Sequence, residues 1–219
     1  MGKKKAKKPV VLVFGEDDYD RQSIAELVRA LCPEAPPVRK RQSPLVLVKG
    51  REAAEAEKNA KKAAGVVRAA MRKADVRLVI AHQDCDAVEP AHIALSGSIE
   101  STWGKEMPCP VVAATPAFEM ETWWFLFPDA VAKVVSAWRP LPRGNRDVGN
   151  INNATEALTR ALRPNTKKKP RDYTESDASE VARHVRELEV VQKPIGKSNS
   201  FLRFANAIIK HLCPPKQKK

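Results

Sequence analysis

The sequence predicts an α/β fold, a three-layer, Rossmann-like parallel sheet flanked by helices and followed by a C-terminal helical extension. Short apolar runs rich in β-branched residues alternate with longer segments of helical periodicity, as in parallel sheets. These runs carry no polar alternation, so both faces of each strand are expected to be covered. With 219 residues, the chain is long enough for one sizeable core with a small appendage.

Four apolar runs are expected to be strands. The first covers residues 9–14 (PVVLVF), between a basic tail and Gly15. The others are residues 44–48 (PLVLV), 76–81 (VRLVIA) and 111–115 (VVAAT). Because helical segments separate them, the strands are expected to run parallel.

Helices are expected between and after these strands. Asp20 is placed to cap the first helix, and Pro33 lies just beyond its end. An alanine-rich helix with a charged face is expected over residues 51–73, and one continuous helix is expected from Glu119 to Trp138. The remaining segments are residues 90–104, which are helical or irregular, and the helices 154–162, 176–188 and 198–211.

The predicted organisation is a basic tail over residues 1–8, an α/β domain over residues 9–139 and a helical extension over residues 140–219 that packs on the same core. The formal net charge is +13. A field of this size favours a polyanion as partner, and nucleic acid is the usual one. Much of the excess lies in the basic runs KKKAKK, KKKPR and KQKK, and such runs also serve solubility alone.

Several classes of protein are not expected. No apolar run approaches the roughly twenty residues that cross a bilayer, and the run after the basic tail ends in acids, unlike a secretory leader. The four cysteines lie far apart without a CxxC pair, which argues against a disulfide framework or a zinc site. No glycine-rich phosphate loop follows a strand. A cytoplasmic protein without membrane contact is expected.

Acidic side chains follow two of the predicted strands. Glu16 stands just beyond the first, and Asp84 and Asp86 follow the third. Asp84 and Asp86 share a face if the backbone stays extended through Cys85. If the two strands are neighbours, these acids meet at the carboxyl edge of the sheet, where functional groups gather. Crowded carboxylates either take up protons or bind a cation, and oxygen ligands suit Mg²⁺ or Mn²⁺.

Each acid also has a simpler explanation. Loop acids are often caps or solvated charges, and Glu119 and Glu121, which open the helix after the fourth strand, would interact favourably with the helix dipole. His82 would be a proton carrier, a phosphate contact or a hydrogen-bonded spacer. It is the combination of acids at two strand ends that indicates a metal site.

The chain resembles the Toprim domain of topoisomerases, primases and OLD-type nucleases in two stretches, VVLVFGE and LVIAHQDCD. In that family a glutamate follows the first strand and a DxD pair follows a later one. The stretches PAFEMETWWF and SFLRFANAI resemble a helix opening and the C-terminal helix of small bacterial Toprim-like proteins, including the RloB-like proteins. Proteins of this kind are often encoded beside ATPases in anti-phage defence islands. Residues 9 to about 128 carry the main likeness.

The resemblance implies metal-dependent hydrolysis of DNA or RNA as the effector of a defence system. The metal would polarise the phosphate and activate a water molecule. The implied ligands of Mg²⁺ or Mn²⁺ are Glu16, Asp84, Asp86 and Glu119, and the implied catalytic residues are Glu16, Asp84, Asp86 and Glu121. Asp17 and Asp18 follow Glu16 directly, so the sequence leaves open which of the three faces the metal. It also leaves open which acid of the late helix does so.

Four basic residues are candidates for holding the nucleic-acid backbone: Lys49, Arg51, Lys193 and Lys197. Each of them also has the ordinary role of a solvated surface charge. The sequence does not distinguish DNA from RNA as the bound partner.

A second hypothesis is a non-catalytic partner or regulator of an ATPase, in which the acids serve metal-dependent folding or docking. Trp123 and Trp124 would then form a contact surface, whereas their more ordinary role is to fill the core beside the fourth strand. Co-purification with an ATPase in the absence of nuclease activity would favour this hypothesis. Assembly into a homo-oligomer is compatible with both.

Overall fold

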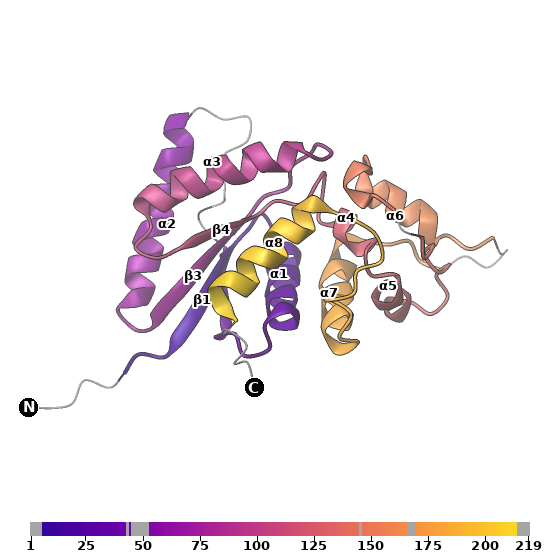
Figure 1. Ribbon diagram of the computed structural model, residues 1–219, viewed down its shortest axis with the longest axis horizontal. Helices are drawn as coiled ribbons and strands as arrows, with labels where there is room; N and C mark the ends of the chain where they lie inside the picture. Colours follow the sequence, from indigo (N-terminus) through magenta and orange to yellow (C-terminus); the bar gives the residue numbers. More distant parts are fainter. Residues whose placement is uncertain (1–5, 43, 45–52, 145, 166–169, 214–219) are drawn as a thin grey trace, which may run out of the picture.

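The chain forms a four-stranded parallel sheet with helices on both faces (Figure 1). The computed structural model describes residues 6–42, 44, 53–144, 146–165 and 170–213. The strands lie in the order β2-β1-β3-β4. Their bounds are β1 Pro9–Phe14, β2 Val38–Arg41, β3 Asp75–His82 and β4 Val111–Ala114. The predicted fold class is confirmed.

Three of the four predicted strands are found at or within two residues of their expected positions. The prediction for residues 44–48 lies outside the described residues, except for Pro44. The observed second strand, β2, has the sequence VRKR, and periodicity does not reveal so short and charged a segment. Within the described ranges it is an edge strand that pairs with β1 alone, and its basic side chains are exposed or half-buried.

The helices follow the expected order along the chain. Their bounds are α1 Asp18–Leu31, α2 Ala53–Met71, α3 Ala91–Glu106, α4 Glu121–Trp124, α5 Pro128–Val134, α6 Ala154–Leu162, α7 Ala178–Glu187 and α8 Asn199–Leu212, with the 3₁₀ turns η1 Val148–Asn150 and η2 Glu175–Asp177. The segment from Glu119 to Trp138 is two short helices, so the expectation of one continuous helix is wrong. Pro128 is the reason, because it starts α5 and cannot continue a preceding helix.

The first helix also begins earlier than expected. Asp17 is its N-cap, and the Asp17 side chain accepts a hydrogen bond from the backbone N–H of Asp20 at 2.7 Å. Asp20 therefore lies inside the first turn, and the prediction that it caps the helix is wrong. With its own backbone N–H held by Asp17, Asp20 is free to direct its carboxylate toward the sheet.

Successive residues of β1 enter two different cores. Val11 and Val13 belong to the core beneath α1 and α8, whereas Val10, Leu12 and Phe14 belong to the core beneath α2 and α3 (Figure 1). This alternation explains why the run PVVLVF is apolar throughout. All but its first residue are buried.

The helices after residue 139 share the first of these cores. The helix α7 packs along α1, and an ion pair of 2.7 Å between Arg186 and Glu26 joins the two. Trp123 stacks on Phe204 of α8 and is fully buried, as is Trp124. The two tryptophans therefore fill the core and do not form a contact surface.

The strand order places a topological switch point between β1 and β3. The chain leaves β1 for α1 on one face, whereas it leaves β3 for α3 on the opposite face. The two loops therefore diverge, and in open parallel sheets ligands bind in the crevice between such loops. None of the helices among the described residues is long and apolar enough to cross a membrane.

Candidate functional site at the carboxyl edge of the sheet

The ends of β1 and β3 lie in close contact at the switch point. Phe14 pairs with Ala81 in the parallel register, so Gly15 and His82 follow side by side. A Cβ atom added to Gly15 would stand 3.4 Å from His82 Cβ and 3.1 Å from Arg21 Cγ. The absence of a side chain at Gly15 therefore lets the loop that carries Glu16 approach His82 closely.

His82 is completely buried between two acids. Its Nε2 lies 3.3 Å from Asp84 Oδ1, and its Nδ1 lies 3.6 Å from Asp20 Oδ2. Burial by itself lowers the pKa of an imidazole, but the charges of Asp20, Asp84 and Glu16 outweigh that effect and raise the pKa of His82 to about 9. Neither ring nitrogen meets strict hydrogen-bond geometry with a described residue, but the 3.3 Å approach of Asp84 to Nε2 also favours the protonated ring. At neutral pH His82 is thus a buried cation within an acidic cluster.

Asp84 is the acid that the others share as a neighbour. Loss of hydration, the larger cause, and the charge of Asp84 together raise the pKa of Glu16 to about 7 and that of Glu121 to about 8. Burial and Asp84 also raise the pKa of Asp20 to about 6, although His82 opposes this shift. Glu16 as a residue is exposed, yet enough protein surrounds its carboxyl group to favour the protonated form. The edge therefore holds more negative charge than His82 neutralises.

The two acids after Glu16 have other partners. Asp17 caps α1, and Asp18 forms an ion pair with Lys40 of β2 at 2.8 Å. The hydrogen bond from Lys40 lowers the pKa of Asp18. Of the three consecutive acids, Glu16 is the one whose carboxyl is coupled to Asp84.

Asp86 stands at the outer rim of the site. The backbone stays extended through Cys85, whose N–H donates to the Pro116 carbonyl at 3.2 Å, and then turns at Asp86 with a φ of 45°. Asp86 is exposed, and its charge contributes to the raised pKa of Glu16. The charges of Asp84, which is half-buried, and of Asp86, which is exposed, therefore both raise the pKa of Glu16.

The acids of the late helix face different neighbours. Glu121 is buried, and its Oε1 accepts a hydrogen bond of 2.8 Å from the Tyr173 hydroxyl. Glu119 points to α6, where its Oε2 accepts bonds from the Thr155 N–H at 2.9 Å and the Thr155 hydroxyl at 2.8 Å. Glu121 therefore lies near Asp84, whereas Glu119 binds the start of α6. The expected role of Glu119 as a metal ligand stays a prediction.

Two of the four basic candidates lie within the described residues. Lys49 and Arg51 lie outside the described residues. Lys193 and Lys197 are exposed on the loop between α7 and α8, where the Lys197 backbone N–H donates to the Arg146 carbonyl at 2.7 Å. Their contact with nucleic acid stays a prediction.

Two members of the cluster are not evident from the sequence. Asp20 is predicted as a helix cap, and it reaches the cluster because Asp17 caps α1 and leaves Asp20 in the first turn. Tyr173 is separated from Glu121 by 52 positions and belongs to the helical extension. No local pattern reveals such a partner, because tertiary packing alone creates the contact.

The donor chemistry at this edge fits a hard divalent cation. Its acids are carboxylates that repel one another, and Asp84 Oδ1 is buried with no hydrogen bond from the part of the chain that the structure describes. Within the described ranges, no three His, Cys, Asp or Glu side chains are arranged to hold a metal ion as they stand. A shared ion would therefore require the carboxylates to move toward a common point.

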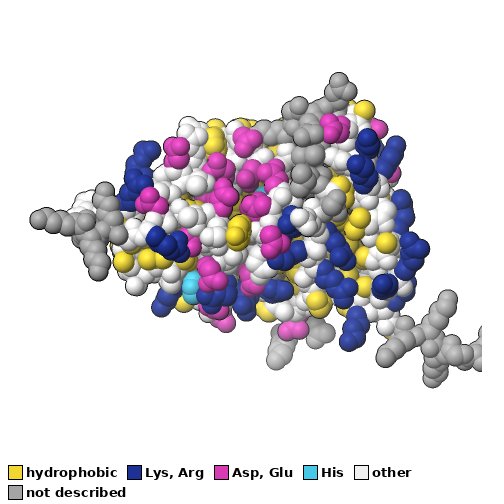
Figure 2. All heavy atoms as spheres, turned by 180° about the vertical axis from the view of Figure 1, so that it is seen from behind, with side chains coloured by type: hydrophobic (Ala, Val, Ile, Leu, Met, Phe, Trp, Pro, Cys, Tyr) yellow, Lys and Arg dark blue, Asp and Glu magenta, His cyan; other side chains and the backbone are white. Residues whose placement is uncertain are grey.

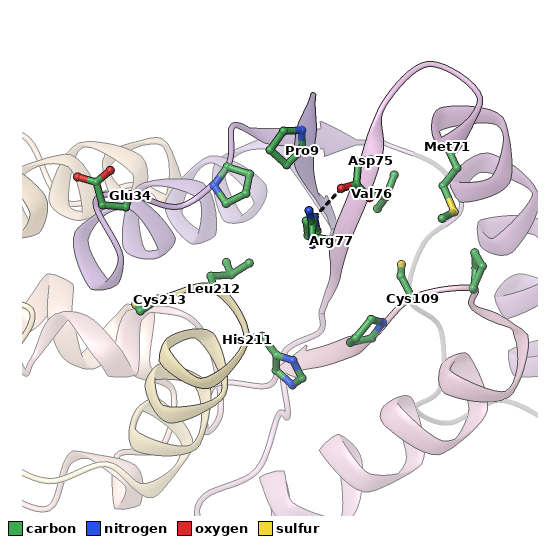
Figure 3. Close-up of a pocket in the computed structure, with 13 residues that line it drawn as sticks. Pro9, Glu34, Met71, Asp75, Val76, Arg77, Cys109, His211, Leu212 and Cys213 are labelled. Atoms are coloured by element: carbon green, nitrogen blue, oxygen red, sulfur yellow. Dashed lines mark ion pairs between the residues drawn. The ribbon is translucent and has the colours of Figure 1, made fainter. Parts of the chain in front are cut away.

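A hollow of 810 Å³ lies at the opposite end of the sheet, where β1 and β3 begin (Figure 3). Pro9, Val76 and Cys109 line it, together with His211 and Leu212 at the end of α8. Of its two acids, Glu34 and Asp75, the second is paired with Arg77 at 2.6 Å, as the dashed line in Figure 3 marks. The described carboxyl groups with strongly raised pKa values, those of Glu16, Asp20 and Glu121, lie at the carboxyl edge, so we assign the candidate site there and not to this hollow.

Comparisons with models of protein families, with curated proteins and with solved structures found no match to this chain. The parallel sheet, its strand order and the acidic cluster therefore carry the functional argument.

Proposed function

We propose that the chain is a Mg²⁺- or Mn²⁺-dependent nuclease that hydrolyses phosphodiester bonds in DNA or RNA. The observation that carries the proposal is the meeting of Glu16, Glu121 and Asp20 around Asp84 at the switch point of a parallel sheet. The sequence likeness to Toprim domains agrees with it, because the acids after β1 and β3 are those that the likeness assigns to the metal. A role as effector of a bacterial defence system follows from the same likeness.

In this proposal Glu16, Asp84 and Asp86 hold the ion, which when bound polarises the phosphate and supplies an activated water. Glu16 stands at the solvent side, where it would serve as a ligand of the ion or as a general base, and in the metal-free chain its pKa is raised to about 7. His82 holds Asp84 from the buried side and limits the repulsion among the acids. Glu121, protonated near neutral pH, supplies a proton donor beside Asp84.

The test is cleavage of plasmid, linear duplex and transfer RNA in Mg²⁺ or Mn²⁺. Asp84→Asn and Glu16→Gln are each expected to lower the rate about 100-fold or more, because each removes a ligand or proton acceptor. Asp18→Asn is the matched control, since it removes the same charge two residues from Glu16, at the start of α1, but from a carboxylate already paired with Lys40. Its rate is expected to stay within a few-fold of wild type.

Thermal melting of each variant must first show that it folds. If wild type cleaves none of the substrates, or if all three variants lose activity equally, the nuclease proposal fails. Co-purification with an ATPase in that case would support the alternative of a non-catalytic partner.

A further inference from the structure

The solvent side of α2 carries a stripe of basic side chains. Lys58, Lys61 and Lys62 are exposed and lie within about one helical turn of one another. Arg68 and Arg72 continue the stripe beyond them, and both are exposed. From position 58 to position 73 the sequence contains no acid. Positive charge therefore accumulates along one side of a single rigid element.

The N-terminal basic residues join this stripe at its far end. The Lys7 ammonium donates a hydrogen bond of 2.5 Å to the carbonyl of Met71, the last residue of α2. Lys7 and Lys8 are both exposed. A segment more than sixty positions away thus extends the same basic surface.

The stripe leads to the candidate site. The helix α2 connects the parallel strands β2 and β3, so it runs against them and begins at their carboxyl ends. Lys58 lies toward the carboxyl edge of the sheet, where Glu16 and Asp84 meet and which we call the acidic edge. Lys7 lies at the other end of the sheet. Fourteen residues from Lys58 to Arg72 correspond to about 21 Å of helix. Figure 2 shows Asp and Glu side chains gathered in the upper middle of this face, with Lys and Arg side chains gathered beside them on the side of α2.

We propose that this basic stripe binds the sugar–phosphate backbone of a nucleic acid and directs it to the acidic edge. A row of exposed cations along a helix matches a row of phosphates and requires no reading of bases. An anionic membrane is the less suitable partner, because α2 exposes no large apolar side chain that could enter a bilayer. The direction toward the acids rests on the proposed nuclease function, whereas binding itself does not need the acids.

The test is binding by wild-type protein in EDTA, which prevents cleavage, to fluorescent single-stranded DNA, RNA and duplex DNA at several salt concentrations. The variant Lys58→Gln/Lys61→Gln/Lys62→Gln removes three charges from the stripe. We expect its affinity at low salt to fall about tenfold or more. The slope of log affinity against log salt should fall by about 2 to 3, since each phosphate contact contributes about 0.7 to 0.9.

The matched control is Lys133→Gln/Arg160→Gln/Lys210→Gln, which removes the same charge from exposed positions on α5, α6 and α8. It is expected to weaken binding at most a few-fold, with a slope change below about 1. Equal effects of the two triple variants would overturn the inference. So would the absence of wild-type binding, or tighter binding to phosphatidylserine vesicles than to any nucleic acid.

Cleavage in Mn²⁺ separates this inference from the proposed function. If binding depends on the stripe but the protein cleaves no substrate, the nuclease proposal is wrong and the binding surface stands. If the protein cleaves and the stripe variant binds as well as wild type, the binding surface is wrong and the nuclease proposal stands.

Discussion

A buried imidazolium is costly unless anions surround it, and His82 meets that condition with a carboxylate near each ring nitrogen. Glu16 and Asp84 could be predicted from the sequence, because acids just beyond buried parallel strands point to one edge. The central position of His82 could not, since a histidine that ends a strand has the same local pattern whether it is a spacer or a counter-ion. Its surroundings come from α1 and from Gly15, which only folding brings together.

Tyr173 is expected to position Glu121. Its hydroxyl donates the 2.8 Å hydrogen bond that lowers the pKa of Glu121 against the effect of burial. Tyr173→Phe should cost about 1 kcal/mol of unfolding free energy. Because Glu121 acts as a proton donor in the proposed function, the substitution should also shift the alkaline limb of the pH profile of Mn²⁺-dependent cleavage to higher pH. Urea unfolding and cleavage rates between about pH 6 and 9 measure both effects.

Tyr19→Phe is the control. It removes the same hydroxyl oxygen, but from an exposed tyrosine on α1. A profile that moves equally in both variants, or in neither, would contradict the positioning role of Tyr173.

At the scale of elements, α8 is held by an acid far away in the sequence. Glu89 accepts hydrogen bonds from the backbone N–H groups of Asn199 and Ser200 and from the Ser198 hydroxyl. These bonds provide acceptors for backbone N–H groups at the start of α8. They also lower the pKa of Glu89, although burial alone would raise it. Helices with apolar stripes, such as α8, could be predicted from the sequence, but this attachment could not.

Gly149→Ala is expected to release that attachment. The new Cβ would stand 2.2 Å from Glu89 Cδ, and Glu89 cannot move without leaving α8. We expect a loss of about 1 to 3 kcal/mol in urea unfolding. Gly65→Ala is the contrasting change, because its Cβ meets nothing within 4 Å and lies within a helix. It should stabilise by about 0.5 to 1 kcal/mol, and equal losses in both variants would refute this account.

At the scale of the whole molecule, the acidic edge makes stability depend on pH. Glu16, Asp20, Glu121 and His82 all have folded pKa values above their ordinary ones. Each group therefore binds its proton more tightly in the folded chain, so its contribution is complete below the unfolded pKa and is lost as pH rises through the folded pKa. The metal-free protein is expected to lose stability from about pH 4 to about pH 9.

A divalent cation should replace the lost protons. Mn²⁺ at about 100 times its dissociation constant adds about 2.7 kcal/mol, which corresponds to a melting temperature several degrees higher. This increase should be larger at about pH 8 than at about pH 5.5, where protons compete with the ion. Asp84→Asn should abolish it and Asp18→Asn should retain it. An increase that is larger in acid, or that survives in Asp84→Asn, would argue against a shared ion at this edge.

The sequence predicted the fold at this scale better than the site. Apolar strands such as PVVLVF and VRLVIA can be recognised in the sequence, and their parallel order follows from the helices between them. The edge strand VRKR cannot be recognised in this way, because it is partly buried and most of its side chains are charged. The acids Glu16 and Asp84 come from those readable strands, whereas Tyr173 comes from the extension, whose docking depends on packing against α1 and α4.

The hydrogen bond between Tyr173 and Glu121 also sets an order of events during synthesis. Ribosomes make the strands that carry the first acids well before they reach Tyr173, and domains begin to fold as they emerge. Until that later segment docks, Glu121 lacks its partner and the constellation is unfinished. Under the proposed nuclease function, a nascent chain would stay inactive toward nearby messenger RNA until the segment with Tyr173 has been translated and has packed against Glu121.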